Sequence, residues 1–285
     1  VLALGQPGDK VAVSRTAHRS ILSALVLAGL EPIWMSPDID EATGVPMGIG
    51  ATEVSKALNE NPIAILLTEP GYLGTISELP ALISMAHENS IPVIVDAAWG
   101  GHFGFNSQIP AHVLQLGADA LITSVHKALP GYSASALLLA QGKFLNLARI
   151  EQSFETTHTT SPAGAPLASI DGCRALLQTR GDQLTGELLK YVQDFKNSVQ
   201  SHFETPIFLN PSDFVPGRFD PVKIVLRANL LGLSGVDVEK QLQKANIRVE
   251  MADRDTIVFL ATLADNAEDF AALADALIPI LKSLQ

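Results

Sequence analysis

Side chains that could do chemistry gather after four short apolar runs of this sequence. The runs are residues 11–13, 63–67, 92–95 and 118–123, and the candidates that follow them are His18, then Thr68 and Tyr72, then Asp96 and Trp99, then Ser124, His126 and Lys127. Ligands of open α/β sheets bind at the carboxyl ends of the strands. If the four runs are strands of one sheet, we therefore expect a carboxylate, a lysine amine, imidazoles, hydroxyl groups and aromatic rings to meet in one crevice.

This combination of groups suits catalysis with pyridoxal 5′-phosphate (PLP). A lysine amine forms a Schiff base with the cofactor, and an aspartate pairs with its pyridine nitrogen and keeps the ring able to accept electrons. Asp96 and Lys127 follow successive runs and stand 31 positions apart. Taken singly, an aspartate that ends a strand is most often a helix cap, and a His-Lys pair is most often a surface feature. In this order and together, they favour PLP chemistry.

The elements that must position these residues follow from the apolar pattern. Short continuous apolar runs predict strands covered on both faces, and their alternation with helical patterns predicts a mainly parallel sheet with right-handed crossovers. We expect strands at 11–13, 32–35, 63–67, 92–95, 118–123 and 135–140, and helices at 18–28, 52–59 (with Thr52 as N-cap), 77–88 and 111–115. The first half is therefore predicted to be α/β, a mainly parallel sheet flanked by helices.

The second half predicts a different architecture, a small α+β C-terminal domain. Its expected helices are 163–179, 183–202, 236–245 and 267–284, and its expected strands are 222–226 and 256–260. The Pro- and Gly-bearing stretch 210–221 is expected to be a surface loop. We therefore predict a PLP-binding large domain at residues 1–180, followed by a linking helix and the small domain at residues 181–285.

Composition and charge exclude several classes of function. Of the 285 residues, 47% are hydrophobic and 17% are charged, which excludes disorder as the main state and allows a large core. Lys and Arg number 19 against 30 Asp and Glu, and the net charge of −11 argues against a nucleic-acid partner. No run approaches the roughly 18 to 20 uninterrupted apolar residues of a membrane span, so we expect no membrane association.

Cysteine and histidine content bears on metals and on the cellular compartment. Cys173 is the single cysteine, so no intrachain disulfide and no cysteine-rich metal site can form. The spacing of His102, His112 and His126 is not that of metal ligands, and we expect no metal. No secretory signal is visible, and one cysteine fits a reducing compartment, so the cytoplasm is the expected location.

Several segments resemble the Orn/Lys/Arg decarboxylases, which are fold-type-I (aspartate aminotransferase-like) PLP enzymes. Residues 93–105, VIVDAAWGGHFGF, resemble the family's pyridine-nitrogen segment, and residues 120–131, ALITSVHKALPG, resemble its Ser-x-His-Lys segment. Residues 7–20 resemble the segment with the ring-stacking histidine, and residues 159–162 and 235–250 resemble later motifs. The resemblance covers nearly the whole chain.

The resemblance implies a PLP-dependent decarboxylase that converts arginine, lysine or ornithine to its amine and CO₂, in polyamine biosynthesis. It implies that Lys127 forms the Schiff base, Asp96 holds the pyridine nitrogen and His18 stacks on the ring. The implied cofactor-binding set is Lys127, Asp96, His18, Ser124, His126, Ala98, Trp99 and Thr68, and the implied catalytic set is Lys127, His126 and Asp96.

The distal cation of such a substrate requires a carboxylate partner. Glu250, Asp253 and Glu69 are candidates, and we expect Glu250 and Tyr72 to contact the substrate. Fold-type-I sites usually lie at a dimer interface, so the resemblance also implies a homodimer or a larger homo-oligomer. Two alternatives stay open at this point: another fold-type-I reaction, such as amino transfer or elimination, and an inactive homologue or fragment.

The start of the chain carries an expectation of its own. Residues 1–4 are typical of the tail of a helix, stopped by Gly5-Gln6-Pro7-Gly8. The family has an N-terminal Gly-Ser/Thr loop that opens a helix and grips the cofactor phosphate, and we expect that loop and one strand upstream of Val1. The 285-residue chain alone is then expected to bind PLP more weakly than a chain extended upstream.

Overall fold

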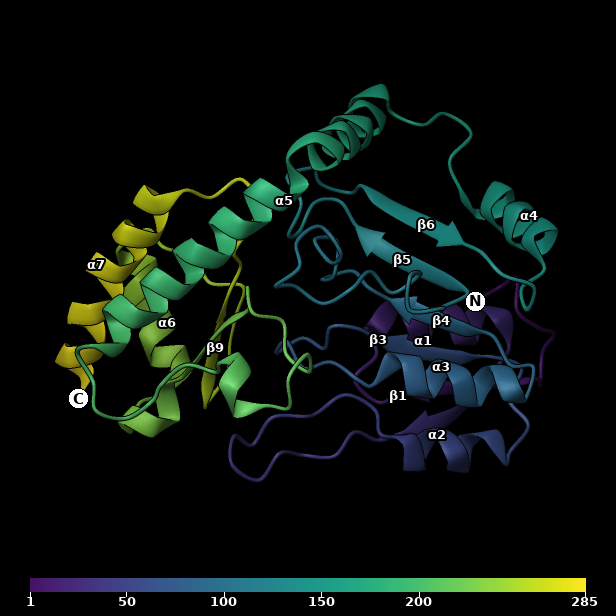
Figure 1. Ribbon diagram of the computed structural model, residues 1–285, viewed down its shortest axis with the longest axis horizontal. Coiled ribbons are helices and arrows are strands. Elements are labelled where there is room, and N and C mark those ends of the chain that lie inside the picture. Colours follow the sequence, from purple (N-terminus) through teal and green to yellow (C-terminus); the bar gives the residue numbers. More distant parts are fainter.

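The computed structural model describes residues 1–285 and contains two β-sheets, each packed against its own helices (Figure 1). The larger sheet has the strand order β2-β1-β3-β4-β5-β6. Its strands are β1 (Lys10–Ser14), β2 (Glu31–Met35), β3 (Ile65–Thr68), β4 (Val93–Asp96), β5 (Ala120–Ser124) and β6 (Ala136–Ala140). Neighbours from β2 to β5 are parallel, and β6 runs antiparallel to β5. The expected α/β class with a mainly parallel sheet is confirmed.

Helices cover both faces of the centre of the larger sheet, which is why β1, β3 and β4 are continuous apolar runs. The coverage expected for every strand is not found at β6, which buries none of its residues and leaves Leu138 42% exposed. The helices are α1 (Arg19–Ala28), α2 (Ala51–Leu58), α3 (Leu79–Glu88) and α4 (Leu147–Thr157). On one face, Leu66 and Ile94 belong to the same buried cluster as Leu25 of α1. On the other face, Leu67 and Val95 belong to the same buried cluster as Val54 of α2 and Leu82 of α3.

The smaller sheet is antiparallel, with the strand order β7-β9-β8. Its elements are α5 (Gly164–Gln200), η1 (Pro211–Asp213), β7 (Ile224–Arg227), η2 (Ala228–Leu231), α6 (Gly235–Lys244), β8 (Met251–Ala252), β9 (Thr256–Phe259) and α7 (Ala267–Leu284). Figure 1 shows α5 running from the large sheet down to the small one, where it lies beside α7. Because α5 passes through residue 180 unbroken, the domain division at that position stays a prediction.

Four local predictions are wrong, each for a physical reason. The helices expected at 163–179 and 183–202 are one helix, because Gly181 stays helical and packs against the ring of Phe105, where a Cβ would meet it at 2.8 Å. The stretch 111–115 forms turns rather than a helix, and Gly117 at φ 103° ends them. Thr52 is not an N-cap, because α2 already begins at Ala51. Residues 1–4 form a turn, not a helix tail.

Two parts of the structure, helix α4 and the stretch 210–221, differ from what the sequence pattern predicts. Helix α4 was not predicted, and it buries none of its side chains, so it has no buried stripe for a pattern to reveal. The stretch 210–221 is not simply a surface loop, because Phe214 and Phe219 stack at 4.8 Å and are buried together with Asp220. These residues pack against the part of the chain around Val45 and Gly74, beside the larger sheet.

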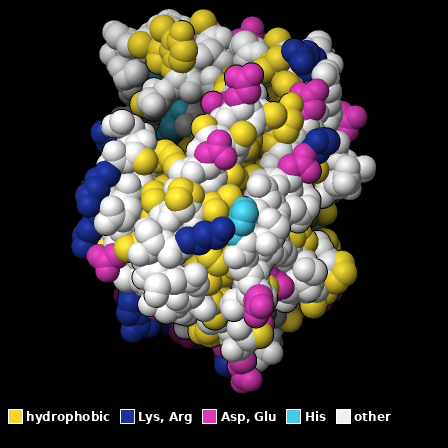
Figure 2. Space-filling model, turned by 90° about the vertical axis from the view of Figure 1, so that its left-hand side faces the viewer, with side chains coloured by type: hydrophobic (Ala, Val, Ile, Leu, Met, Phe, Trp, Pro, Cys, Tyr) yellow, Lys and Arg dark blue, Asp and Glu magenta, His cyan; other side chains and the backbone are white.

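No helix combines the length and the apolar character needed to cross a membrane. Figure 2 looks onto the side formed by the small domain, where acidic and basic side chains both appear, separated by apolar and uncharged atoms.

Candidate active site

The carboxyl ends of three neighbouring parallel strands bring the predicted residues together. Thr68, Asp96 and Ser124 are the last residues of β3, β4 and β5. Thr68 pairs directly with Asp96 in the sheet register, and Asp96 pairs with Ile122 of β5. Lys127 follows Ser124 by three residues, so a lysine and an aspartate come from adjacent strand ends, as the sequence predicted.

Asp96 borders a cavity that is lined mainly by apolar side chains. Its Oδ1 accepts a hydrogen bond from the backbone N–H of Ala98 at 3.1 Å. The cavity measures about 380 Å³ between the sheet, α1 and α4, and Asp96 is the one carboxylate in its lining. Beside it in the sheet, the Thr68 hydroxyl is buried without a hydrogen-bond partner. An unpaired buried hydroxyl next to an open carboxylate indicates a place for a polar ligand.

Trp99 is in contact with both Lys127 and Tyr72. The amine of Lys127 lies 4.4 Å from the centre of its ring, and Tyr72 packs edge-on against it at 5.5 Å. The Tyr72 hydroxyl donates to Oε1 of Glu250, 2.9 Å away and on the small domain. Burial and the hydrogen bond to Glu250 raise the pKa of Tyr72. Tyr72 and Glu250, each of which the sequence analysis expects to contact the substrate, are therefore in direct contact with each other, one aromatic ring away from Lys127.

The two histidines of the predicted site differ in their environment. His126 donates from Nδ1 to the carbonyl of Ser135 at 2.6 Å, which leaves its Nε2 without a protein partner. His18 is exposed at the N-cap of α1, where its Nδ1 accepts from the backbone N–H of Ser20 at 3.3 Å. No hydrogen bond or aromatic contact joins His18 to Asp96 or Trp99, so its stacking role stays a prediction.

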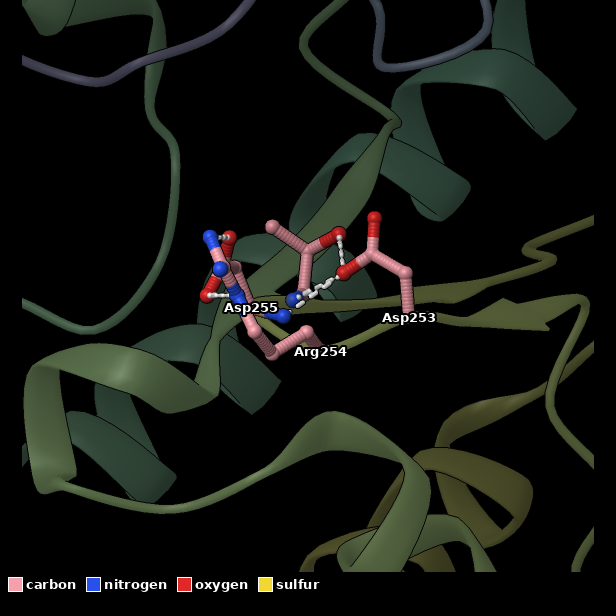
Figure 3. A network of polar contacts seen from close by, with 4 residues as sticks. Asp253, Arg254 and Asp255 are labelled. Carbon is pink, nitrogen blue, oxygen red and sulfur yellow. Dashed lines mark hydrogen bonds and ion pairs between the residues drawn. The ribbon is translucent and has the colours of Figure 1, made fainter.

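Two of the three candidate carboxylates are used by the fold itself. Glu69 is 1% exposed and accepts from the backbone N–H of Ser77 at 3.0 Å, and burial raises its pKa to about 7. Asp253 shapes the turn between β8 and β9, where its Oδ1 accepts from the N–H of Thr256 at 2.6 Å (Figure 3). Glu250 is the candidate that contacts a predicted site residue, Tyr72.

Sequence reasoning missed three buried polar residues behind Trp99. His102 donates from Nε2 to Oδ1 of Asp220 at 3.1 Å, and each residue is 1% exposed. The ammonium of Lys223 lies 3.8 Å from the centre of the Trp99 ring. The available signal was a charged residue on each side of the start of the predicted strand 222–226, namely Asp220 in the expected loop and Lys223 within the expected strand.

Backbone hydrogen bonds hold this missed segment to the large domain. Asp220 donates from its N–H to the carbonyl of Gly74 at 2.8 Å, and Ile76 donates to the carbonyl of Arg218 at 2.9 Å. Gly74 has φ 99°, and a Cβ there would lie 2.7 Å from Cγ of Lys223. A glycine at this turn is therefore needed both for the backbone conformation and for the close approach of the lysine.

The sheet, the flanking helices and the strand-end residues define a class of protein. The constitutive lysine decarboxylase of Escherichia coli superposes with a TM-score of 0.82 at 18% identity, over 99% of this chain and 47% of that one. An alanine–glyoxylate aminotransferase from Nostoc sp. gives 0.75 at 16% identity, over 98% of this chain and 77% of that one. The fold is that of the fold-type-I, aminotransferase-like enzymes, a class that depends on PLP.

Sequence comparison names the family within that class. The model of the Orn/Lys/Arg decarboxylase major domain matches residues 1–269, and the chain belongs to this family. It is 34% identical over 294 residues to the arginine decarboxylase of Bacillus subtilis, covering 100% of this chain and 59% of that protein. It is 35% identical over 283 residues to the arginine decarboxylase of Bacillus cereus, covering 97% and 61%. The chain thus spans about 60% of the length of these relatives.

Proposed function

We propose that this protein decarboxylates a basic L-amino acid, with PLP as its cofactor. The observation that carries the proposal is the placement of Asp96 and Lys127 at adjacent strand ends, with Trp99 beside the lysine. Membership of the decarboxylase family and the curated names of the relatives support the reaction type and the choice among arginine, lysine and ornithine as substrate.

The residues present fit PLP. The cofactor carries an aldehyde, a pyridine nitrogen and a phosphate, and the site offers an amine, a carboxylate and hydroxyl groups. Lys127 would hold PLP through its amine, and Asp96 would pair with the pyridine nitrogen. Thr68, whose buried hydroxyl lacks a partner, and Ser124 would supply hydrogen bonds. We propose His18, Ala98 and Trp99 as the remaining residues around the ring.

The chain's own groups would do the proton transfer and the orientation. PLP, when bound, supplies a ring that accepts the electron pair left on Cα as CO₂ departs. Asp96 would keep the pyridine nitrogen protonated, so that this acceptance is favourable. His126, fixed by its bond to the carbonyl of Ser135, presents a free Nε2, and this nitrogen or the amine of Lys127 would return a proton to Cα. Tyr72 and Glu250 would receive the distal cation of the substrate.

The test is release of CO₂ from L-arginine, L-lysine and L-ornithine in the presence of PLP and the absence of any keto acid. A decarboxylase releases CO₂ and one equivalent of the amine from at least one of these substrates. An aminotransferase requires a keto-acid acceptor and releases no CO₂. Acceptor-dependent amino transfer without CO₂ would overturn the proposed function.

We also propose that the protein acts in the cytoplasm as a homodimer or larger homo-oligomer. The single cysteine supports a reducing compartment, and exposed apolar side chains on α1 support association. Val26 is 81% exposed and Leu27 is 78% exposed, which is unusual for two neighbouring apolar residues of one helix. Sedimentation equilibrium gives the oligomeric state, and a monomer at all protein concentrations would contradict this assembly.

A further inference from the structure

Lys223 is a buried cation to which neither the fold nor the proposed chemistry gives an anionic partner. It lies just ahead of β7, and 6% of its surface is exposed. No hydrogen bond and no ion pair holds its ammonium. The ammonium lies instead over two aromatic rings, 3.8 Å from the centre of Trp99 and 5.6 Å from the centre of Tyr72. A buried charge without an anionic partner is unfavourable, so its presence requires a reason.

The carboxylates around Lys223 are already engaged with other residues. Asp220 and Glu250 are close enough to attract its charge, but neither forms an ion pair with it. Asp220 accepts a hydrogen bond from His102, and Glu250 accepts one from Tyr72. Burial lowers the pKa of Lys223 to about 8 in spite of these two carboxylates.

Lys196 shows how the same fold satisfies a lysine with a structural role. It is 3% exposed and also feels the charge of Asp220, but its ammonium donates to the carbonyl of Leu209 at 2.9 Å. Lys223 has no such backbone partner. An open cation in this position therefore points to an anion that comes from outside the chain.

The surroundings of Lys223 identify the chemistry of that anion. The amine of Lys127 lies 4.4 Å from the centre of the same Trp99 ring, so the anion would bind beside the proposed reactive lysine. A basic amino acid offers two cationic groups and one carboxylate, and only the carboxylate is attracted to an ammonium. Glu250, held by Tyr72, presents the opposite charge for the distal cation.

We propose that Lys223 binds the carboxylate of the amino-acid substrate and thereby sets which end of the substrate lies against Trp99. The proposal rests on the proposed function. Because the carboxylate leaves as CO₂, the contact exists with the substrate and is absent with the amine product. Such a contact strengthens binding of the amino acid more than it accelerates the reaction. Lys223 is therefore expected to control the preference for the amino acid over the amine.

The test compares L-arginine with agmatine, which is arginine without its carboxylate. Calorimetric titrations use protein incubated with PLP and then reduced with borohydride, so that no turnover occurs. The wild type is expected to bind L-arginine more tightly than agmatine. Lys223→Met is expected to weaken L-arginine binding about 10- to 100-fold, with a much smaller change for agmatine. In the unreduced enzyme, the KM for L-arginine is expected to rise far more than kcat falls.

Lys196→Met is the matched control, because it removes an equally buried lysine outside the site and should leave the ratio of the two affinities unchanged. A Lys223→Met protein that keeps the wild-type preference, or that loses affinity for both ligands alike, overturns the proposal. If that variant does not fold, Lys223→Arg replaces it and must keep the preference. Failure of the proposed function gives a different result, namely no CO₂ from any of the three amino acids with wild-type protein.

Discussion

Two aspartates lie at opposite ends of the neighbouring strands β4 and β5. Asp119 directly precedes β5 and Asp96 ends β4, and the two carboxylates differ in how many hydrogen bonds they accept. At the amino end, Asp119 is 2% exposed, and its Oδ2 accepts from His87 at 2.8 Å and from the N–H of Val93 at 2.8 Å. At the carboxyl end, Asp96 accepts a single hydrogen bond, from Ala98, and borders an open cavity. The satisfied aspartate holds the fold together, and the open one is available for chemistry.

The two buried lysines of the small domain repeat this difference. Lys196 is bound to a carbonyl of its own chain, whereas Lys223 lies over aromatic rings beside the candidate active site. In each pair, the residue with fewer hydrogen bonds, Asp96 or Lys223, is the one near Lys127. A charged side chain that the rest of the chain leaves without a full set of partners is available to a ligand.

The largest expected effect comes from Asp96→Asn. A neutral amide would not hold the pyridine nitrogen of PLP protonated, so we expect kcat to fall by about 10² to 10³, the range for loss of one charge-stabilising group. The melting temperature should change little, because Asp96 forms one hydrogen bond within the chain. Turnover close to that of the wild type would remove Asp96 from the catalytic set.

Asp119→Asn is the matched control at the other end of the strands. It weakens a buried carboxylate that binds both His87 and a backbone N–H, so we expect a loss of about 1 to 3 kcal/mol in the free energy of unfolding. Turnover per folded molecule should stay at the wild-type level. A large loss of turnover with unchanged stability would contradict the division between the two strand ends.

The two buried lysines, Lys223 and Lys196, should also differ in their effect on the stability of the fold. Burial lowers the pKa of both Lys223 and Lys196 to about 8, below the ordinary value of 10.5. The folded state therefore binds fewer protons than the unfolded state between these values, and stability should rise as the pH increases from about 8 to 10.5.

At pH 7, Lys223→Met should raise the melting temperature, because the cost of burying the charge exceeds its attraction to the nearby carboxylates and lowers the pKa of Lys223. Lys196→Met should lower the free energy of unfolding by about 1 kcal/mol, because it leaves the Leu209 carbonyl without its donor. Thermal melts of both variants at pH 7 and pH 10 provide the measurement. Equal shifts of the same sign would mean that the two lysines do not differ in role.

Glu69 is expected to have a smaller effect, on how the free energy of unfolding depends on pH. This effect tests whether its carboxyl has a structural role. Its pKa is raised from 4.5 to about 7, so the folded state binds more protons than the unfolded state in this interval. The cost of burying the ionised carboxyl is absent below about pH 4.5 and grows as the pH rises through 7, to an upper bound of about 3.4 kcal/mol, so stability falls with pH across this interval. Glu69→Gln should flatten this slope in chemical denaturation, and an unchanged slope would assign it to other groups.

The sequence predicted the parts of the site that follow strand ends and missed the parts that come from tertiary packing. Asp96, Ser124 and Thr68 end neighbouring strands as expected, because apolar runs mark strands and ligands bind at their carboxyl ends. The open cavity beside Asp96 and the unpaired hydroxyl of Thr68 are visible only in three dimensions.

Asp220 and Lys223 were missed because their role depends on contacts with a turn of the large domain near Gly74, far away in the sequence. Asp220 lies in a stretch whose proline and glycine are typical of a loop, and Lys223 lies in an expected strand. Neither local pattern shows which distant turn the segment packs against. Helix boundaries failed for a related reason, since Gly181 continues a helix by packing against Phe105 rather than ending it.

The proposed function depends most directly on Lys127, whose amine would hold the cofactor. The most direct measurement is to incubate the protein with PLP, reduce it with borohydride, digest it and locate the added mass by peptide mass spectrometry. We expect one equivalent of adduct on Lys127, and no adduct at this position in Lys127→Ala. An adduct on Lys223, on Lys196 or on a surface lysine, with Lys127 unmodified, would contradict this expectation.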